Sequence, residues 1–267
     1  VVGQAGTVTI SNCSTQSTTI TVDGSILGSQ VAGGIVGYAS GSEINIADSA
    51  TKIFGTNLYS GYFGGIVGIS SGSSITNTLF KGSIKYTLKD AAESYPYIGG
   101  IVGEVRNNSV STIDSAVVYG TIQYSATSGI SPSQYTAAVV GGVTSNATAN
   151  VSNCFGRRLK GNPTSICANN EATATVNVNN SDAGLNYTSI KNRVADFDSN
   201  IWWEVENRDQ VVLMVTNDYS VYGDDTLNGL SYNANTKLSS ITAALTATLS
   251  NGKLYSSSTR LAGGLVD

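Results

Sequence analysis

This chain of 267 residues contains no histidine, three prolines and three cysteines. Without histidine it lacks both the commonest general base and the commonest metal ligand of proteins. Three cysteines with no histidine do not make a zinc-type ligand set either. We therefore expect no metal and no cofactor, we assign no catalytic residue, and we expect a protein that is not an enzyme.

Charge is also scarce: charged residues make up 12% of the chain, with 14 Lys and Arg against 18 Asp and Glu. The basic residues are spread thinly and form no stripe of the kind that binds nucleic acid. No apolar run approaches the roughly 20 residues needed to cross a bilayer. We expect neither a nucleic-acid partner nor membrane insertion. Because the chain opens on Val1 with no signal peptide or starting Met, we expect a mature protein or a segment of a longer one.

Glycine is abundant, and much of it lies in a repeated five-residue block. The block is Gly-Gly-Ile-Val-Gly at residues 33–37, 64–68 and 99–103. A degenerate copy, Ala-Ala-Val-Val-Gly, lies at 137–141. Successive copies start 31, 35 and 38 residues apart, a period typical of solenoids, propellers and other repeat arrays. The motif glycines are Gly33, Gly34, Gly37, Gly64, Gly65, Gly68, Gly99, Gly100, Gly103 and Gly141.

A second column accompanies the glycine blocks: an Asn or Asp followed by a small residue. We predict a ladder of turns at Asn12, Asp48, Asn77, Asp114 and Asn153, in which each side chain bonds to backbone groups. Between the turns, apolar residues alternate with polar ones, as in half-buried strands. One coil with about three short strands cannot bury its apolar face alone, but stacked coils can. The sequence therefore predicts an all-β fold, a β-solenoid of about five coils.

The glycine blocks and the polar turns that follow them resemble the GLUG-motif repeat family over about residues 1–160. Residues 196–202 (Asp-Phe-Asp-Ser-Asn-Ile-Trp) resemble the aromatic segment that closes such arrays. The resemblance implies a secreted or cell-surface, adhesin-like protein, and it transfers no catalytic residue.

The rest of the chain divides into two segments. Residues 161–217 hold both tryptophans, and we predict closing strands and an aromatic cap that covers the last coil. Residues 218–267 are expected to be strand-rich or mixed. They end on a partial repeat made of Leu261, Gly263, Gly264, Leu265 and Val266.

This partial repeat has two explanations. The tail of one subunit completes the first coil of the next and builds a head-to-tail filament, or the chain is one segment of a longer tandem array. A free-standing domain is the third alternative.

Three groups of side chains are candidate sites. Cys13 and Cys154 occupy one repeat column, about 19 Å apart in a regular stack, so they cannot bond to each other. We predict a disulfide between Cys154 and Cys167, with Cys13 a buried thiol. Tyr62, Tyr97 and Tyr135 form another column, which either packs ring on ring or offers a platform to glycans. N-glycosylation sequons begin at Asn12, Asn107, Asn146, Asn150, Asn179 and Asn186, about as many as this composition gives by chance.

The function that this pattern favours is a non-catalytic, extracellular structural or adhesive module whose main partner is another copy of itself. The alternative is a carbohydrate-binding solenoid. Carbohydrate cleavage is less favoured, because the acidic residues are scattered and do not form the facing pair that glycosidases use.

Overall fold

The computed structural model describes residues 2–16, 18–23, 30–58, 61–88, 96–125, 135–159, 162–205, 211–213, 247–250 and 253–256. The chain divides into two compact units, Val1–Asn186 and Tyr187–Asp267. Among the described residues the first unit consists of strands, and the second holds one short helix. The all-β solenoid prediction is confirmed.

Four complete coils, each of four strands, make up most of the first unit. They are β1 (Val2–Gly6), β2 (Thr9–Thr15), β3 (Thr19–Asp23) and β4 (Gln30–Gly33); β5 (Val36–Ser40), β6 (Glu43–Ser49), β7 (Lys52–Leu58) and β8 (Gly61–Gly64); β9 (Val67–Ser71), β10 (Ser74–Phe80), β11 (Ser83–Leu88) and β12 (Tyr97–Gly99); and β13 (Val102–Val105), β14 (Val110–Val118), β15 (Thr121–Ser125) and β16 (Thr136–Ala137). Two partial coils follow. They hold β17 (Val140–Val143) and β18 (Thr148–Arg157), then β19 (Cys167–Asn170), β20 (Thr175–Asn179) and β21 (Asp182–Leu185).

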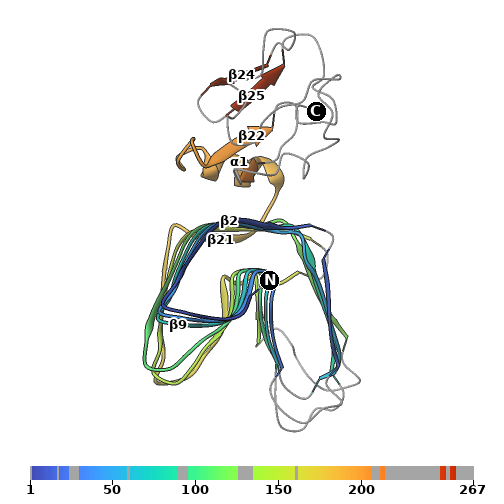
Figure 1. The fold of residues 1–267 in the computed structure, drawn as a ribbon, viewed down its shortest axis with the longest axis vertical. Coiled ribbons are helices and arrows are strands. Elements are labelled where there is room, and N and C mark those ends of the chain that lie inside the picture. The colour runs from blue at the N-terminus through green and yellow to red at the C-terminus, as the bar shows by residue number, and fades with distance from the viewer. Residues whose placement is uncertain are drawn as a thin grey trace. The chain divides into compact units, whose positions relative to one another are not determined.

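Equivalent strands of successive coils pair in parallel, and in Figure 1 they lie one behind another. Sheet A is β1-β5-β9-β13-β17-β19. Sheet B is β2-β6-β10-β14-β18-β20, with β21 also paired to β18. Sheet C holds β3, β7, β11 and β15, and sheet D holds β4, β8, β12 and β16. A coil therefore has four strands, where about three were predicted.

The apolar core runs along the inside of the stack as columns of equivalent residues. In sheet B, Ile44, Ile75 and Ile113 are in register and fully buried. Ile53, Ile84 and Ile122 form the matching column in sheet C. Because successive side chains of a strand point to opposite faces, the residues next to these isoleucines along each strand point outward.

The glycine blocks form the corner at which the chain leaves sheet D and enters sheet A. A Cβ on Gly34 would collide with the carbonyl oxygen of Gly65, and one on Gly65 with that of Gly100. Gly100 faces Ala138 in the same way. These glycines are thus required by the close approach of neighbouring coils.

The third glycine of each block lies where sheets A and D meet. A Cβ on Gly103 would stand 2.5 Å from the Gly68 carbonyl oxygen and 2.7 Å from the Phe63 nitrogen. Gly3 belongs to the same column, since Val2 pairs with Val36, but no atom lies within 4 Å of the corresponding point there.

The second unit contains the helix α1 (Tyr187–Val194) and four described strands. These are β22 (Trp202–Val205), β23 (Val211–Leu213), β24 (Ala247–Ser250) and β25 (Lys253–Ser256), and they form one sheet of order β23-β22-β25-β24. Trp202 and Trp203 are buried, and Phe197 meets Trp202 edge to face at 5.5 Å. The helix was not predicted. The aromatic cap stays a prediction.

The strands β19, β20 and β21 lie in the segment 161–217, for which closing strands and an aromatic cap are predicted, and they continue sheets A and B. The first compact unit extends to Asn186. The partial repeat from Leu261 to Val266 lies outside the described residues.

Candidate functional site

At the N-terminal end of the solenoid, the described core residues are less buried than those of the inner coils. β1, β2, β3 and β4 are the outermost strands of their four sheets, and no described strand pairs with their outer edges. Ile10 and Ile20 are only half-buried, whereas their equivalents one coil later, Ile44 and Ile53, are fully buried. This end therefore presents backbone edges and apolar side chains together.

The far end of sheet B is open in the same way. Val178 on β20 continues the column of Ile113 and Val151, yet 49% of its surface is exposed. The end of sheet C, by contrast, is closed by a side chain. Asn162 Oδ1 accepts from the Ile122 nitrogen at 2.9 Å, and Asn162 Nδ2 donates to the Gly120 carbonyl at 3.0 Å.

Asparagines on sheet B form a ladder of side-chain hydrogen bonds. Nδ2 of Asn77 donates to Oδ1 of Asn45 at 3.0 Å, Nδ2 of Asn153 to Oδ1 of Asp114 at 2.9 Å, and Nδ2 of Asn180 to Oδ1 of Asn153 at 2.7 Å. In every rung the amide nitrogen of the later coil donates to the coil before it. The three donors lie in a backbone column that has positive φ throughout, at Asn12, Ile46, Asn77, Ser115, Asn153 and Asn180. The acceptors Asn45 and Asp114 lie one residue before this column.

Of the residues predicted to form the turn ladder, Asn12, Asn77 and Asn153 share the left-handed column, whereas Asp48 and Asp114 lie outside it. The hydrogen bonds of Asn77 and Asn153 described above join side chains to side chains, not to the backbone groups that were predicted. Asp114 pairs with Thr76, one residue before the left-handed position, and its carboxylate accepts from the Ser152 and Asn153 side chains. Asp48 pairs with Leu79, two residues after that position. Its carboxylate is buried and binds Lys81 at 2.6 Å.

The predicted disulfide between Cys154 and Cys167 is not formed, and the structure holds all three cysteines as thiols. Cys154 lies on β18 in sheet B, whereas Cys167 lies on β19 in sheet A, in register with Val140. Burial raises the pKa of the Cys154 thiol to about 12, and burial likewise raises that of Cys167 to about 12. The shared column of Cys13 and Cys154 is confirmed, because Ala47, Thr78 and Ala116 connect them.

The tyrosine column also forms as predicted. Tyr62 pairs with Tyr97, and their rings stack with centroids 5.9 Å apart and planes 10° apart. Tyr135 meets Tyr97 edge to face at 5.6 Å. The Arg106 guanidinium lies 5.3 Å from the Tyr62 ring centroid. A sugar stacks on an open aromatic face, and these faces already contact neighbours, so the ring packing argues against the glycan platform.

Sequence reasoning missed a buried acid beside this column. Glu104 on β13 is 3% exposed, accepts from Thr144 Oγ1 at 2.7 Å, and lies 3.4 Å from a guanidinium nitrogen of Arg106. Burial raises the pKa of Glu104, although the Thr144 hydrogen bond and the Arg106 charge act in the opposite direction. The sequence carries a signal for this buried acid, because the equivalent residues of the neighbouring coils, Ile69 and Gly142, are uncharged.

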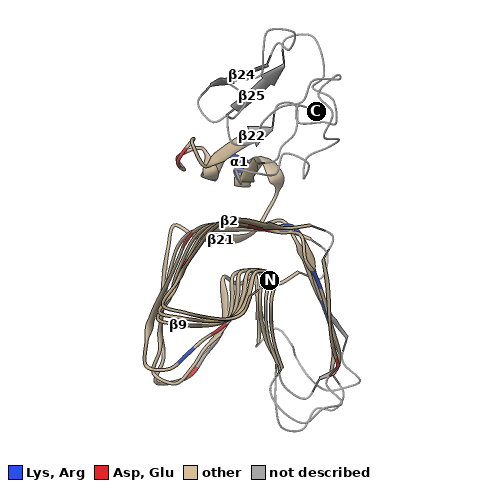
Figure 2. Ribbon diagram, in the orientation of Figure 1, with Lys and Arg blue, Asp and Glu red and all other residues tan. Residues whose placement is uncertain are grey.

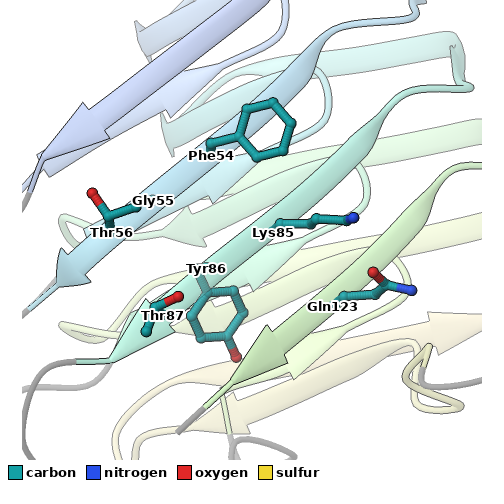
Figure 3. A pocket seen from close by; sticks show the side chains of 7 residues that line it. All are labelled: Phe54, Gly55, Thr56, Lys85, Tyr86, Thr87 and Gln123. Carbon is teal, nitrogen blue, oxygen red and sulfur yellow. The ribbon is translucent and has the colours of Figure 1, made fainter.

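Sheet C carries a shallow hollow of about 350 Å³ (Figure 3). Phe54, Lys85 and Gln123 stand in register on three neighbouring strands, with Thr56 and Thr87 beside them. Lys85 and Gln123 are exposed, and Phe54 is half-buried. An aromatic ring next to an ammonium and an amide is the combination that suits a polar ligand with an apolar face.

The part of the chain that the structure describes holds no group of three or more His, Cys, Asp or Glu side chains that could bind a metal ion. None of the described helices is long and apolar enough to cross a membrane. Figure 2 shows how thinly charge is spread along the coils.

Comparisons with protein-family models, with curated proteins and with solved structures find no match to this chain. The similarity to the GLUG-motif family therefore stays an expectation from the motif residues.

Proposed function

We propose that this chain is a non-catalytic structural module that assembles head to tail, as part of a secreted or surface-attached array with an adhesive role. One observation carries the proposal: at the two ends of sheet B, the core column ends on side chains that are more exposed than its interior members, with Ile10 half-buried and Val178 49% exposed. The resemblance of the glycine blocks to surface repeat proteins supports the extracellular location.

The open ends lack the usual protection against pairing. Edge strands of monomeric proteins carry charges, prolines or bulges that discourage a second chain. Residues 2–23 contain a single charged residue, Asp23, and residues 167–179 contain only Glu171. Neither stretch contains proline. Such edges favour the addition of another chain by backbone hydrogen bonding.

Concentration-dependent assembly tests this function. Sedimentation velocity and electron microscopy of the full chain should show oligomers and rods that grow with concentration. Val178→Lys should abolish them, because it places a charge at the open end of the core column. Val110→Lys is the matched control, since Val110 is 58% exposed on an internal coil. A protein that stays monomeric at millimolar concentration would refute the proposal.

Deleting residues 252–267 separates two routes to assembly. If the tail completes the next subunit's first coil, the deletion should abolish assembly; if coils stack directly, assembly should survive. Part of this segment already has partners, because β25 pairs with β22 and β24 inside the second unit. Direct stacking is therefore the route that we favour.

Carbohydrate binding is the second candidate function, and the hollow on sheet C favours it. Phe54 offers a ring to the apolar face of a sugar, while Lys85 and Gln123 offer donors to its hydroxyl or carboxylate oxygens. Titration with neutral and uronic-acid oligosaccharides should show binding that Phe54→Ala removes. Lys52→Gln, a charge change on the same strand outside the hollow, should leave it intact. Equal loss in both variants would contradict a site at the hollow.

A further inference from the structure

The two open ends of the first unit match each other residue by residue. In sheet A, Val2, Val36, Val67, Val102, Val140 and Cys167 form one continuous column. In sheet B, one column runs from Ile10 to Val178 and the adjacent outward column from Ser11 to Asn179. Each column therefore starts on a terminal strand of its sheet at one end and stops on the terminal strand at the other.

The asparagine ladder is directional, because its hydrogen bonds all run from a later coil to an earlier one. Each rung donates from a later coil to the coil before it, and Asn180 occupies the last coil. Asn12 has the same left-handed backbone, with φ of 54° against 42° at Asn180, but within the described residues no coil precedes it. Asn12 thus occupies the column from which Asn77, Asn153 and Asn180 each donate to the coil before them.

We infer that successive copies join by stacking β1 on β19 and β2 on β20 of the preceding copy, in parallel and in the register of the existing columns. Val2 then lies over Cys167, Ile10 over Val178, Ser11 over Asn179, and Asn12 over Asn180. The inference rests on the proposed head-to-tail function and specifies its joint. The contact is heterologous, so it extends into a rod and does not close into a pair.

The joint uses sheets A and B, because the far end of sheet C is closed by the Asn162 amide. Sheet D ends on β16, and no described strand continues it. The terminal strands of the two continuing sheets, β1, β2, β19 and β20, contain no charged residue. The Val2 and Val178 residues, 38% and 49% exposed in the single chain, become buried when the copies meet.

A register-specific disulfide tests the joint. Positions 11 and 179 are both exposed and lie at opposite ends of the six-strand path of sheet B, about 24 Å apart within one copy. The double variant Ser11→Cys, Asn179→Cys cannot close an intramolecular bridge, which needs Cα atoms within about 7 Å. In the stacked joint the two positions are neighbours on paired strands, about 4.8 Å apart. Mild oxidation should therefore give a ladder of covalent multimers.

The control is Ser11→Cys, Asn177→Cys. Position 177 is on the same face of β20 but two residues along the strand, so in the joint it lies about 8 Å from position 11. We expect at least tenfold less cross-linking than in the in-register variant, with peptide mapping used to count only disulfides between the two introduced positions. Both variants change the same number of exposed residues.

The outcomes distinguish the joint from the wider function. Rods that form without in-register cross-links, or that cross-link better in the control, overturn this joint and leave head-to-tail assembly standing. Absence of any assembly in the wild-type chain overturns both. A cross-linked ladder confined to the in-register variant supports both.

Discussion

Replacing Gly103 by alanine tests why the third glycine of each block is needed. The added Cβ would stand 2.5 Å from the Gly68 carbonyl oxygen and 2.7 Å from the Phe63 nitrogen, both backbone atoms. Ordinary contacts begin near 3.4 Å, so β13 must move by about 0.9 Å. A shift of that size stretches hydrogen bonds of about 2.9 Å beyond their useful range.

The cost follows from these distances. Overpacking costs about 1–3 kcal/mol, and two weakened ladder hydrogen bonds cost about 1 kcal/mol each. We expect Gly103→Ala to lower the free energy of unfolding by about 3–5 kcal/mol, or the midpoint temperature by about 10 °C.

Gly3→Ala is the control, because Gly3 occupies the same column and nothing lies within 4 Å of its Cβ position. It should change stability by no more than about 0.5 kcal/mol. Thermal unfolding followed by circular dichroism measures both variants. Equal effects would refute the close-approach explanation of the repeated glycine.

Three further predictions concern the polar features of the coils. Asn153→Ala removes two ladder hydrogen bonds and puts alanine at a φ of 52°, which should cost about 3 kcal/mol. Asn150→Ala removes one exposed bond to Asn177 and should cost less than about 1 kcal/mol; chemical denaturation should rank the pair in that order, and the reverse order would contradict the ladder. Burial raises the folded-state pKa of Glu104, so its contribution to stability is complete below the unfolded pKa of about 4.3 and is lost as pH rises through the folded pKa. Glu104→Gln should thus gain stability relative to wild type between pH 4 and pH 7, and a constant difference in midpoint temperature would argue against this sign. Alkylation without reduction, followed by mass spectrometry, should count three thiols, with Cys154 modified only on unfolding because its pKa is about 12; a single alkylated thiol in the unfolded protein would show the bridge after all.

The repeat period predicted the solenoid, because registered glycine blocks imply stacked equivalent strands. It did not predict the fourth strand of each coil. The strands of sheet D are two to four residues long and end in the motif itself, as in Gln30–Gly33 and Thr136–Ala137. Such short strands leave too few residues for an alternating pattern to be visible.

The left-handed column was only partly predictable for a different reason. Asparagine tolerates positive φ, so its occurrences point to the right positions. The column also holds Ile46, a β-branched residue that rarely adopts this conformation. The amino-acid sequence alone therefore favours Asp48 as the ladder residue of that coil, whereas the strand register places Ile46 in the column and Asp48 two residues later.

Stacking in chain order also determines how the first unit would respond to pulling. The chain starts on the first coil and leaves on the last, so tension between Val2 and Asn186 acts along the hydrogen bonds that join the coils. Each coil contacts mainly its neighbours and can detach singly. With 31 to 38 residues between motif copies, every detached coil adds about 100–130 Å of extended chain. A rod of such units would therefore lengthen stepwise under load and dissipate mechanical energy as its coils detach.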